Sequence, residues 1–332
     1  LDSACTITLG PNTVSKMWFI ENATSGSQNI IISQGSGANV TIPAGDVKAV
    51  YSDGAGSGAA IVDAFASLNV VDLKVQDDLT VTDDVSVGGT VNGLGILADT
   101  TNFEDSILIS QNASTGTLDA ASNNTGLGDS VFAALTSGDN NVGIGADSLK
   151  GLTTGGANVA VGFAALEANT TASNNTAIGF RSMYSNTTGS SNNAIGSYAM
   201  YENTTGSYNS AIGQSALREN TTGASNTAVG ESALTKNTTA SNNTALGARS
   251  LYVNTTGASN TAVGASVLRS NTTGAYNTGL GASALYANTS GDNNAAFGYY
   301  ALKNNTTGSN NLALGYQAGY GNETGSGNVF LG

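Results

Sequence analysis

Residues 192–209 read NNAIGSYAMYENTTGSYN, and this pattern recurs with little variation through the second half of the chain. Its most regular feature is a glycine every 17 residues, which we call the ruler glycine. The ruler glycines are Gly128, Gly145, Gly162, Gly179, Gly196, Gly213, Gly230, Gly247, Gly264, Gly281, Gly298, Gly315 and Gly332. An unbroken period of this length predicts a solenoid in which each repeat forms one coil.

Two positions in each coil carry large apolar side chains when the ruler glycine is counted as position 0. Position +4 is Leu or Met and position +16 is aliphatic or aromatic, as in Leu217 and Val229. Positions +3 and +15 are mostly Ala or Ser, which allow chain segments to approach closely. Two large side chains cannot offset the entropy lost by ordering a whole coil, so a coil is stable only between neighbours. We therefore expect the +4 and +16 side chains to be buried and the +5 and +6 side chains to be exposed.

Asparagine also recurs at two positions of the coil. Position +13 is Asn from Asn141 to Asn328, and position +7 is Asn from Asn169 to Asn322. Stacked amides can form hydrogen-bonded ladders, and Asn also tolerates left-handed backbone. Asn-x-Thr is a glycosylation sequon as well, but a ladder already explains a residue that keeps the period. A ladder is the preferred interpretation.

The stretch Asn-x-Ala-Ile-Gly predicts a short strand that ends at the ruler glycine. The Ala-Leu part that follows fits either a second strand or one helical turn. The expected fold class is therefore all-β, with short helical turns left open. Residues 124–332 should form a parallel, in-register β-solenoid or β-roll, with neighbouring coils roughly 4.7–4.9 Å apart.

Three segments precede this solenoid. Residues 1–70 predict an N-terminal β-sandwich-like domain, with candidate strands at 5–9, 14–20, 29–33, 39–42, 47–51 and 59–64. Residues 71–98 predict a short β-stalk, because Leu73, Leu79, Val85, Val91 and Leu97 are six residues apart. One apolar edge per chain needs partner chains, so we expect a trimeric stalk. Residues 99–123 are a connector, with a candidate strand at 106–110.

The Asn-x-Ala-Ile-Gly motif resembles the head repeats of trimeric autotransporter adhesins, which form a parallel β-roll shared among three chains. Those repeats are usually shorter than the repeat found here. The whole coil, with Asn-Thr-Thr-Gly and Asn-Thr-Ala-Ile-Gly, is more similar to long tail-fibre proteins of tailed bacteriophages. Residues 7–24, ITLGPNTVSKMWFIENAT, are similar to the front part of such fibres.

This resemblance implies a homotrimeric structural and adhesive fibre, located in the virion tail outside the cell. It implies other tail or baseplate proteins as partners at the N-terminal end, and a tip that binds a host cell-surface glycan or protein. Because the chain stops at a ruler glycine, we expect such a tip beyond Gly332. One alternative is a bacterial trimeric surface adhesin. A less favoured alternative is an ice-binding solenoid, because Thr recurs at +8 and +9.

The charge of the chain argues against several other classes of function. The net charge is −13, and residues 1–125 hold 14 acidic and 3 basic residues. Nucleic-acid binding is not expected from such an acidic chain. The absence of histidine excludes Ser-His-Asp triads and His-ligated metals, and the single Cys5 excludes an internal disulfide. We expect no enzymatic activity, catalytic residue, metal or cofactor, and no membrane insertion.

Position +5 contains the candidate receptor-contact residues. They are Tyr184, Tyr201, Tyr252, Tyr286 and Tyr320, interspersed with Arg218, Arg269 and Lys303. Tyrosines on a rigid rod can stack on sugar rings. The same tyrosines also fit a purely structural role, in which they cover the edge of the coil.

Overall fold

The computed structural model describes residues 4–13, 15–24, 27–64, 90–91, 94–100, 103–110 and 118–332. The chain divides into two units, Leu1–Val85 and Ser86–Gly332, each with its own hydrophobic core. The expected stalk at 71–98 lies largely outside the described residues, which include only 90–91 and 94–98 of it.

The N-terminal unit contains two three-stranded sheets. Its strands are β1 (Cys5–Thr8), β2 (Lys16–Glu21), β3 (Ile30–Ser33), β4 (Val40–Ile42), β5 (Val47–Ser52) and β6 (Ile61–Asp63), each within two residues of its expected position. The orders are β1-β3-β4 and β2-β5-β6, and β1 and β3 are the parallel pair. Ile32, Ile42 and Val50 lie in the core, and Trp18 packs against it. Among the described residues of this unit, the one helical element is η1 (Gly56–Gly58), a 3-10 turn.

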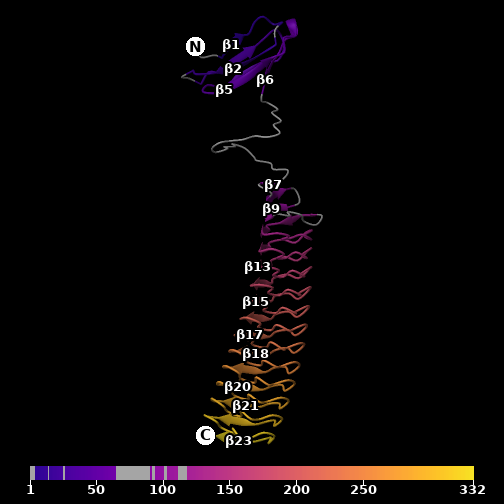
Figure 1. Ribbon diagram of the computed structural model, residues 1–332, viewed down its shortest axis with the longest axis vertical. Coiled ribbons are helices and arrows are strands. Elements are labelled where there is room, and N and C mark those ends of the chain that lie inside the picture. The colour runs from indigo at the N-terminus through magenta and orange to yellow at the C-terminus, as the bar shows by residue number, and fades with distance from the viewer. Residues whose placement is uncertain are drawn as a thin grey trace. The chain divides into compact units, whose positions relative to one another are not determined.

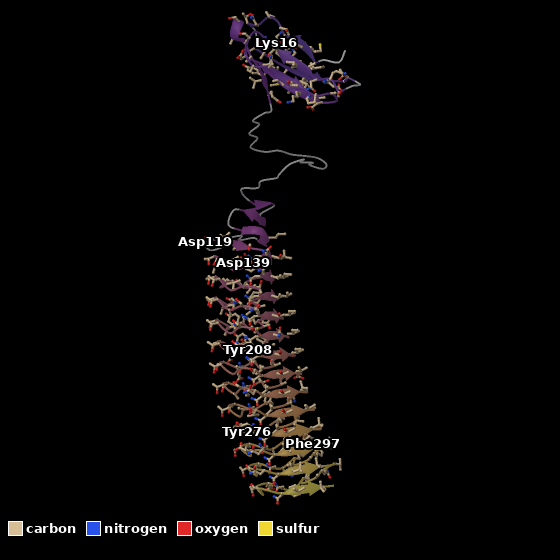
Figure 2. All side chains as sticks on the ribbon, turned by 180° about the vertical axis from the view of Figure 1, so that it is seen from behind. Lys16, Asp119, Asp139, Tyr208, Tyr276 and Phe297 are labelled. Carbon is tan, nitrogen blue, oxygen red and sulfur yellow. The ribbon has the colours of Figure 1, made fainter. Side chains whose placement is uncertain are left out.

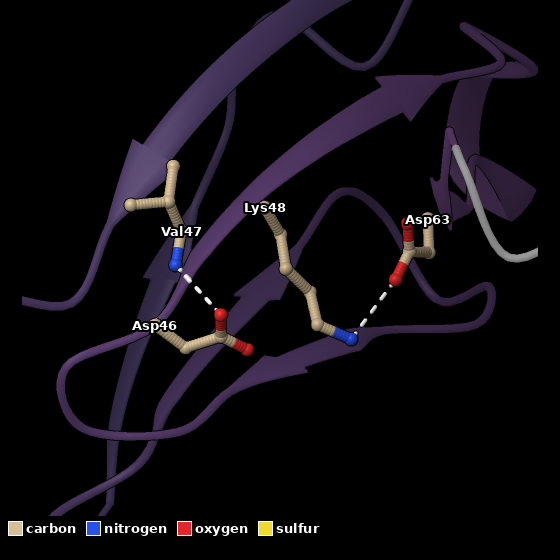
Figure 3. Close-up of polar contacts among 4 residues, drawn as sticks. All are labelled: Asp46, Val47, Lys48 and Asp63. Carbon is tan, nitrogen blue, oxygen red and sulfur yellow. Dashed lines mark hydrogen bonds and ion pairs between the residues drawn. The ribbon is translucent and has the colours of Figure 1, made fainter. Parts of the chain in front are cut away.

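Figure 3 shows two polar contacts of this unit, of which one joins two strands and the other is local to the start of β5. The Lys48 Nζ atom on β5 lies 2.9 Å from Asp63 Oδ2 on β6. The Val47 backbone N–H donates to Asp46 Oδ1 over 2.9 Å at the start of β5. The ion pair is partly exposed to solvent, so its contribution to stability is small.

Three strands lead into the solenoid. They are β7 (Thr90–Val91), β8 (Leu94–Thr100) and β9 (Phe103–Ser110), which pair antiparallel in sequence order. The last of them, β9, contains the expected strand at 106–110 and pairs in parallel with both β10 (Ala121–Ser122) and β11 (Thr125–Leu127). It therefore supplies the edge on which the first coil is built.

The repeats form a parallel, in-register β-solenoid with one three-residue strand in each coil, as expected. The strands after β11 are β12 (Val142–Ile144), β13 (Val159–Val161), β14 (Thr176–Ile178), β15 (Asn193–Ile195), β16 (Ser210–Ile212), β17 (Thr227–Val229), β18 (Thr244–Leu246), β19 (Thr261–Val263), β20 (Thr278–Leu280), β21 (Ala295–Phe297), β22 (Leu312–Leu314) and β23 (Val329–Leu331). Each residue pairs with the one a full repeat away, as Ala194 does with Ala211. Figure 1 shows these strands stacked in one column from β13 to β23.

The second face of each coil is neither a strand nor a helical turn. The ruler glycines from Gly128 to Gly315 have φ between 116° and 142°, and left-handed residues follow at +2 and +4, such as Ser215 (57°) and Leu217 (51°). A helix needs consecutive right-handed residues, so this alternation prevents one. This face is held instead by backbone hydrogen bonds to the next coil. For example, the Leu217 N–H donates to the Ala233 carbonyl at 3.0 Å.

The alternation also turns two consecutive side chains inward. Ala216 and Leu217, at +3 and +4, are both completely buried, and so is Ala211 at +15. The +4 residues therefore form the core, as expected. The expectation for +16 was wrong: Ile212 is 43% exposed, because strand residues alternate and the small +15 residue faces inward. The +5 and +6 side chains are mostly half-buried, rather than exposed as expected.

Both asparagine columns form hydrogen-bonded ladders inside the coils. At +13, the Asn226 backbone N–H donates to Asn209 Oδ1 at 2.9 Å. At +7, Asn237 Nδ2 donates to Asn220 Oδ1 at 2.8 Å. The two ladders meet at position +10, where the Ala240 carbonyl accepts from both Asn226 and Asn237. Burial of the +7 side chains supports the ladder interpretation over glycosylation at that position.

Candidate functional site

Among the described residues, no group of three or more His, Cys, Asp or Glu side chains is placed to hold a metal ion. Within the same residues, no helix is long and apolar enough to cross a membrane. The features that distinguish one coil from another are instead aromatic and basic side chains on the outside of the solenoid.

The five predicted tyrosines at +5 form one column whose rings contact basic side chains. Tyr320 is 37% exposed, and the other four are half-buried. Tyr184 and Tyr201 stack with their ring centroids 5.2 Å apart. Tyr252 and Tyr286 lie on either side of Arg269, which also donates from Nη1 to the Tyr286 hydroxyl at 3.0 Å. Basic residues therefore cover much of the surface predicted to contact a receptor.

A larger aromatic group surrounds the first two of these tyrosines. We call it the aromatic strip, and it consists of Phe163, Phe180, Tyr184, Tyr198 and Tyr201. The two phenylalanines stack at 5.5 Å, and Phe180 meets Tyr198 edge-on at 5.4 Å. Tyr198 in turn meets Tyr201 edge-on at 5.5 Å. The phenylalanines lie at +1 and Tyr198 at +2, positions that were not predicted as part of the site.

Two arginines lie over the aromatic strip. The Arg181 guanidinium carbon is 5.4 Å from the ring centroids of both Phe180 and Tyr184. The Arg218 guanidinium carbon lies 5.8 Å from the Tyr198 centroid and 5.9 Å from that of Tyr201. Such cation–π contacts stabilise a coil stack and leave the edge N–H groups of the guanidinium available.

The basic side chains of the repeats fall into two groups. Three of them have carboxylate partners: Lys150 with Asp147, Lys236 with Glu219, and Arg249 with Glu231. Hydrogen bonds to these carboxylates raise the pKa of Lys150 and of Lys236. Among the described residues, the remaining four make no ion pair and contact aromatic rings instead: Arg181, Arg218, Arg269 and Lys303.

A second aromatic group lies near the end of the solenoid. Tyr299 stacks on Tyr316 at 5.8 Å and contacts Tyr300, whose hydrogen bond raises the pKa of Tyr299. Lys303 lies over Tyr300 at 4.2 Å and over Tyr320 at 5.5 Å. The predicted residue Tyr320 therefore belongs to a cluster that includes +1 and +2 rings.

Two further tyrosines project from position +12, at a different corner of the coil. Tyr208 and Tyr276 are 70% and 65% exposed and are labelled in Figure 2. Neither ring contacts another ring or a cation among the described residues. Both backbones are left-handed, with φ of 60° and 58°. Asn occupies the same position in other coils, such as Asn242.

Replacing Tyr208 with asparagine should therefore stabilise the coil. Asn adopts left-handed backbone more readily than Tyr does, and no packing is lost from an exposed ring. We expect the free energy of unfolding to rise by about 0.5–1 kcal/mol, measured by urea denaturation. Tyr276→Asn should reproduce the gain. A loss of stability in both variants would mean that these rings make contacts that stabilise the coil.

The outer face of the strands, which we call the strand face, combines a continuous apolar column at +16 with a +14 column that is mostly Thr, Ser or Asn. It consists of the +14 and +16 side chains of β11–β23, and Ile178, Ile195 and Ile212 are each about two-fifths exposed. Phe297, labelled in Figure 2, belongs to the same column. Soluble monomers rarely expose an apolar surface that runs the length of a domain.

Comparison of the chain with protein-family models, with curated proteins and with solved structures finds no match.

Proposed function

We propose that this chain forms part of a homotrimeric tail fibre of a tailed bacteriophage. In this proposal the solenoid is a rigid shaft in the virion tail, outside the host cell, and it projects a receptor-binding tip. The resemblance of the repeats and of residues 7–24 to phage fibres supports the phage assignment.

The strand face is the observation that best supports the trimer. A single chain leaves its apolar +16 column, and the mostly polar +14 column beside it, exposed or half-buried along thirteen strands. Three copies packed around one axis would bury all three faces, and closed rotational symmetry leaves none of them unpaired. Apolar burial favours this assembly in proportion to the area removed from water.

The charge distribution suits attachment at the N-terminal end. Residues 1–125 carry 14 acidic and 3 basic residues, which gives −11 from 3 − 14. We propose a basic tail or baseplate protein as the partner of this region, because opposite charges steer association. The proposal includes a host cell-surface glycan or protein as the distal partner, and involves neither nucleic acid nor membrane insertion.

The strand face also suits a bacterial trimeric surface adhesin, which is the second candidate. Ice binding is less favoured, because the +8 hydroxyls already donate to the next coil, as Thr221 Oγ1 does to the Thr238 carbonyl at 3.0 Å. An antibody against the chain separates the first two candidates by electron microscopy. Labelling on tails of phage particles supports the fibre, and labelling on bacterial envelopes supports the adhesin. Thermal hysteresis of the purified chain would favour ice binding instead.

The trimer is tested by placing charges on the strand face. The wild-type chain should sediment at three times its 32.9 kDa mass. The double variant Ile195→Asp/Ile212→Asp should dissociate to the monomer mass, because it puts six carboxylates at the trimer axis. Circular dichroism should be unchanged, since both side chains point away from the coil interior.

The matched control is Thr205→Asp/Thr222→Asp, which adds the same charge at the exposed +9 position of neighbouring coils. This control should remain trimeric. A wild-type chain that is monomeric at micromolar concentration would refute the trimer. A strand-face variant that keeps the full mass would show that assembly uses another surface.

A further inference from the structure

The aromatic strip combines exposed ring surface with positive charge that has no carboxylate partner. Phe163 and Phe180 are 42% and 43% exposed, so their stacked rings present an apolar surface to solvent. The Arg181 and Arg218 side chains above the strip make no ion pair among the described residues. The Nε atom of each is buried and has no hydrogen-bond partner there.

These features are unusual in a chain of net charge −13. Glu202 lies on the coil next to Arg218 and donates its backbone N–H to the Arg218 carbonyl at 2.9 Å, but their side chains form no ion pair. Arg269 has a similar aromatic setting, yet it donates a hydrogen bond to Tyr286. The terminal Nη groups of Arg181 and Arg218, rather than the buried Nε atoms, are therefore the donors from which an external anion can accept hydrogen bonds.

We propose that the aromatic strip binds a carboxylated glycan, such as a chain of uronic or sialic acids. The apolar faces of the sugar rings would stack on Phe163 and Phe180, and a carboxylate would accept hydrogen bonds from the Arg181 guanidinium, whose planar donors match that group. A neutral glycan would leave the arginines unpaired, and a small anion would not use the rings. The inference rests on the proposed function in that it names the ligand class of the receptor-contact surface.

The strip has the size and rigidity for an extended ligand. The strip and Arg218 together lie on the coils that begin at Gly162, Gly179, Gly196 and Gly213, and three strand spacings cover roughly 14–15 Å. Backbone hydrogen bonds connect the neighbouring coils of the site. The Arg181 N–H donates to the Phe163 carbonyl at 2.9 Å, and the Tyr198 N–H donates to the Phe180 carbonyl at 3.0 Å. Little conformational entropy is therefore lost when a ligand binds. The strip lies at +1, +2 and +5, apart from the +14 and +16 columns of the strand face.

The test compares polygalacturonate with its fully methyl-esterified form, which has the same sugar rings without the charge. Binding of each polymer to the full chain is measured by biolayer interferometry. The acid form should bind at least tenfold more tightly than the ester. A sulfated galactan of the same length tests whether a carboxylate is required, and it should bind more weakly than polygalacturonate.

Two variants each replace one residue of the site with the residue that occupies the same coil position elsewhere in the solenoid. Arg181→Ser and Phe180→Ser match Ser215 and Ser197, so both variants should keep the melting temperature of the wild type within a few degrees. Each should weaken binding of polygalacturonate at least tenfold. The control Arg249→Ser makes the same charge change at +2, but at an arginine that faces Glu231 at 3.7 Å, and it should bind as the wild type does.

Equal binding of the acid and the ester would overturn the inference, and so would a preference for the sulfated polymer. Equal losses in Arg181→Ser and Arg249→Ser would also overturn it, because they would indicate general charge attraction. Any of these outcomes would leave the fibre proposal intact, since that proposal is tested by the trimer mass and by labelling of phage tails.

Discussion

Replacing Gly213 with alanine should lower the free energy of unfolding of the solenoid by about 3–6 kcal/mol. Gly213 has φ of 131°, a conformation that a side chain strongly disfavours. An added Cβ would also lie 2.6 Å from the Gly230 carbonyl oxygen and 2.7 Å from its carbon. Both atoms belong to backbone that is hydrogen-bonded to the coils on either side, so neither atom can move without disrupting the stack.

Amide hydrogen exchange is the suitable measurement, because coils of a repeat array can open locally. Protection should fall in the coils on both sides of Gly213. Gly206→Ala is the matched comparison, because its Cβ would also meet backbone, 2.4 Å from the Gly223 carbonyl oxygen, but Gly206 is not among the glycines with positive φ. Ala172 and Ala240 occupy the same position +10 in native coils, so Gly206→Ala should cost less than Gly213→Ala. Equal losses in the two variants would show that the ruler glycine is not special.

Replacing Asn175 with aspartate should cost about 3–5 kcal/mol. The Asn175 side chain is completely buried, donates from Nδ2 to the Gly189 carbonyl at 2.9 Å, and accepts the Asn192 N–H at 2.9 Å. A carboxylate keeps the acceptor, but it loses the donor and brings a charge against a carbonyl oxygen. Burial of an unpaired charge then dominates the loss.

The neighbouring substitution Asn174→Asp adds the same charge at an exposed residue, and it should change stability by less than about 0.5 kcal/mol. Urea midpoints of both variants should be compared at pH 7 and pH 3. Burial raises the pKa of the introduced carboxyl in the folded state. The stability of Asn175→Asp should therefore be recovered below about pH 4, the value for an unfolded aspartate, and lost as pH rises through the folded pKa. A pH-independent deficit would contradict a buried charge.

The solenoid was predictable because its period is visible in single residues. The ruler glycines give the coil length, the asparagine columns give the ladders, and the leucines at +4 give the core. The direction of the +16 side chains was not predictable in the same way. In a three-residue strand, either the small +15 or the large +16 residue can face inward, and the period is the same for both. The interior between the buried Ala211 and Leu217 side chains is thin, so the small +15 residue faces inward and the large +16 residue faces outward.

The candidate site was predicted only in part, for a related reason. The +5 tyrosines form a visible column, but their contacts with Phe180 and Tyr198 depend on the left-handed turn after the ruler glycine. That turn folds positions +1, +2 and +5 onto one corner. Its non-glycine residues carry no sequence signal for left-handed backbone, so the strip could not be assembled from spacing alone.

The direction of the hydrogen bonds between coils has a mechanical consequence. These bonds join each coil to the next, so they point along the stack. A pull on the two ends of the solenoid acts along the bonds and detaches a single coil at a time. Each released coil extends from about 5 Å to roughly 56–61 Å. A rod of this construction is stiff under light load, and it lengthens in steps and dissipates energy when tension exceeds the strength of one coil.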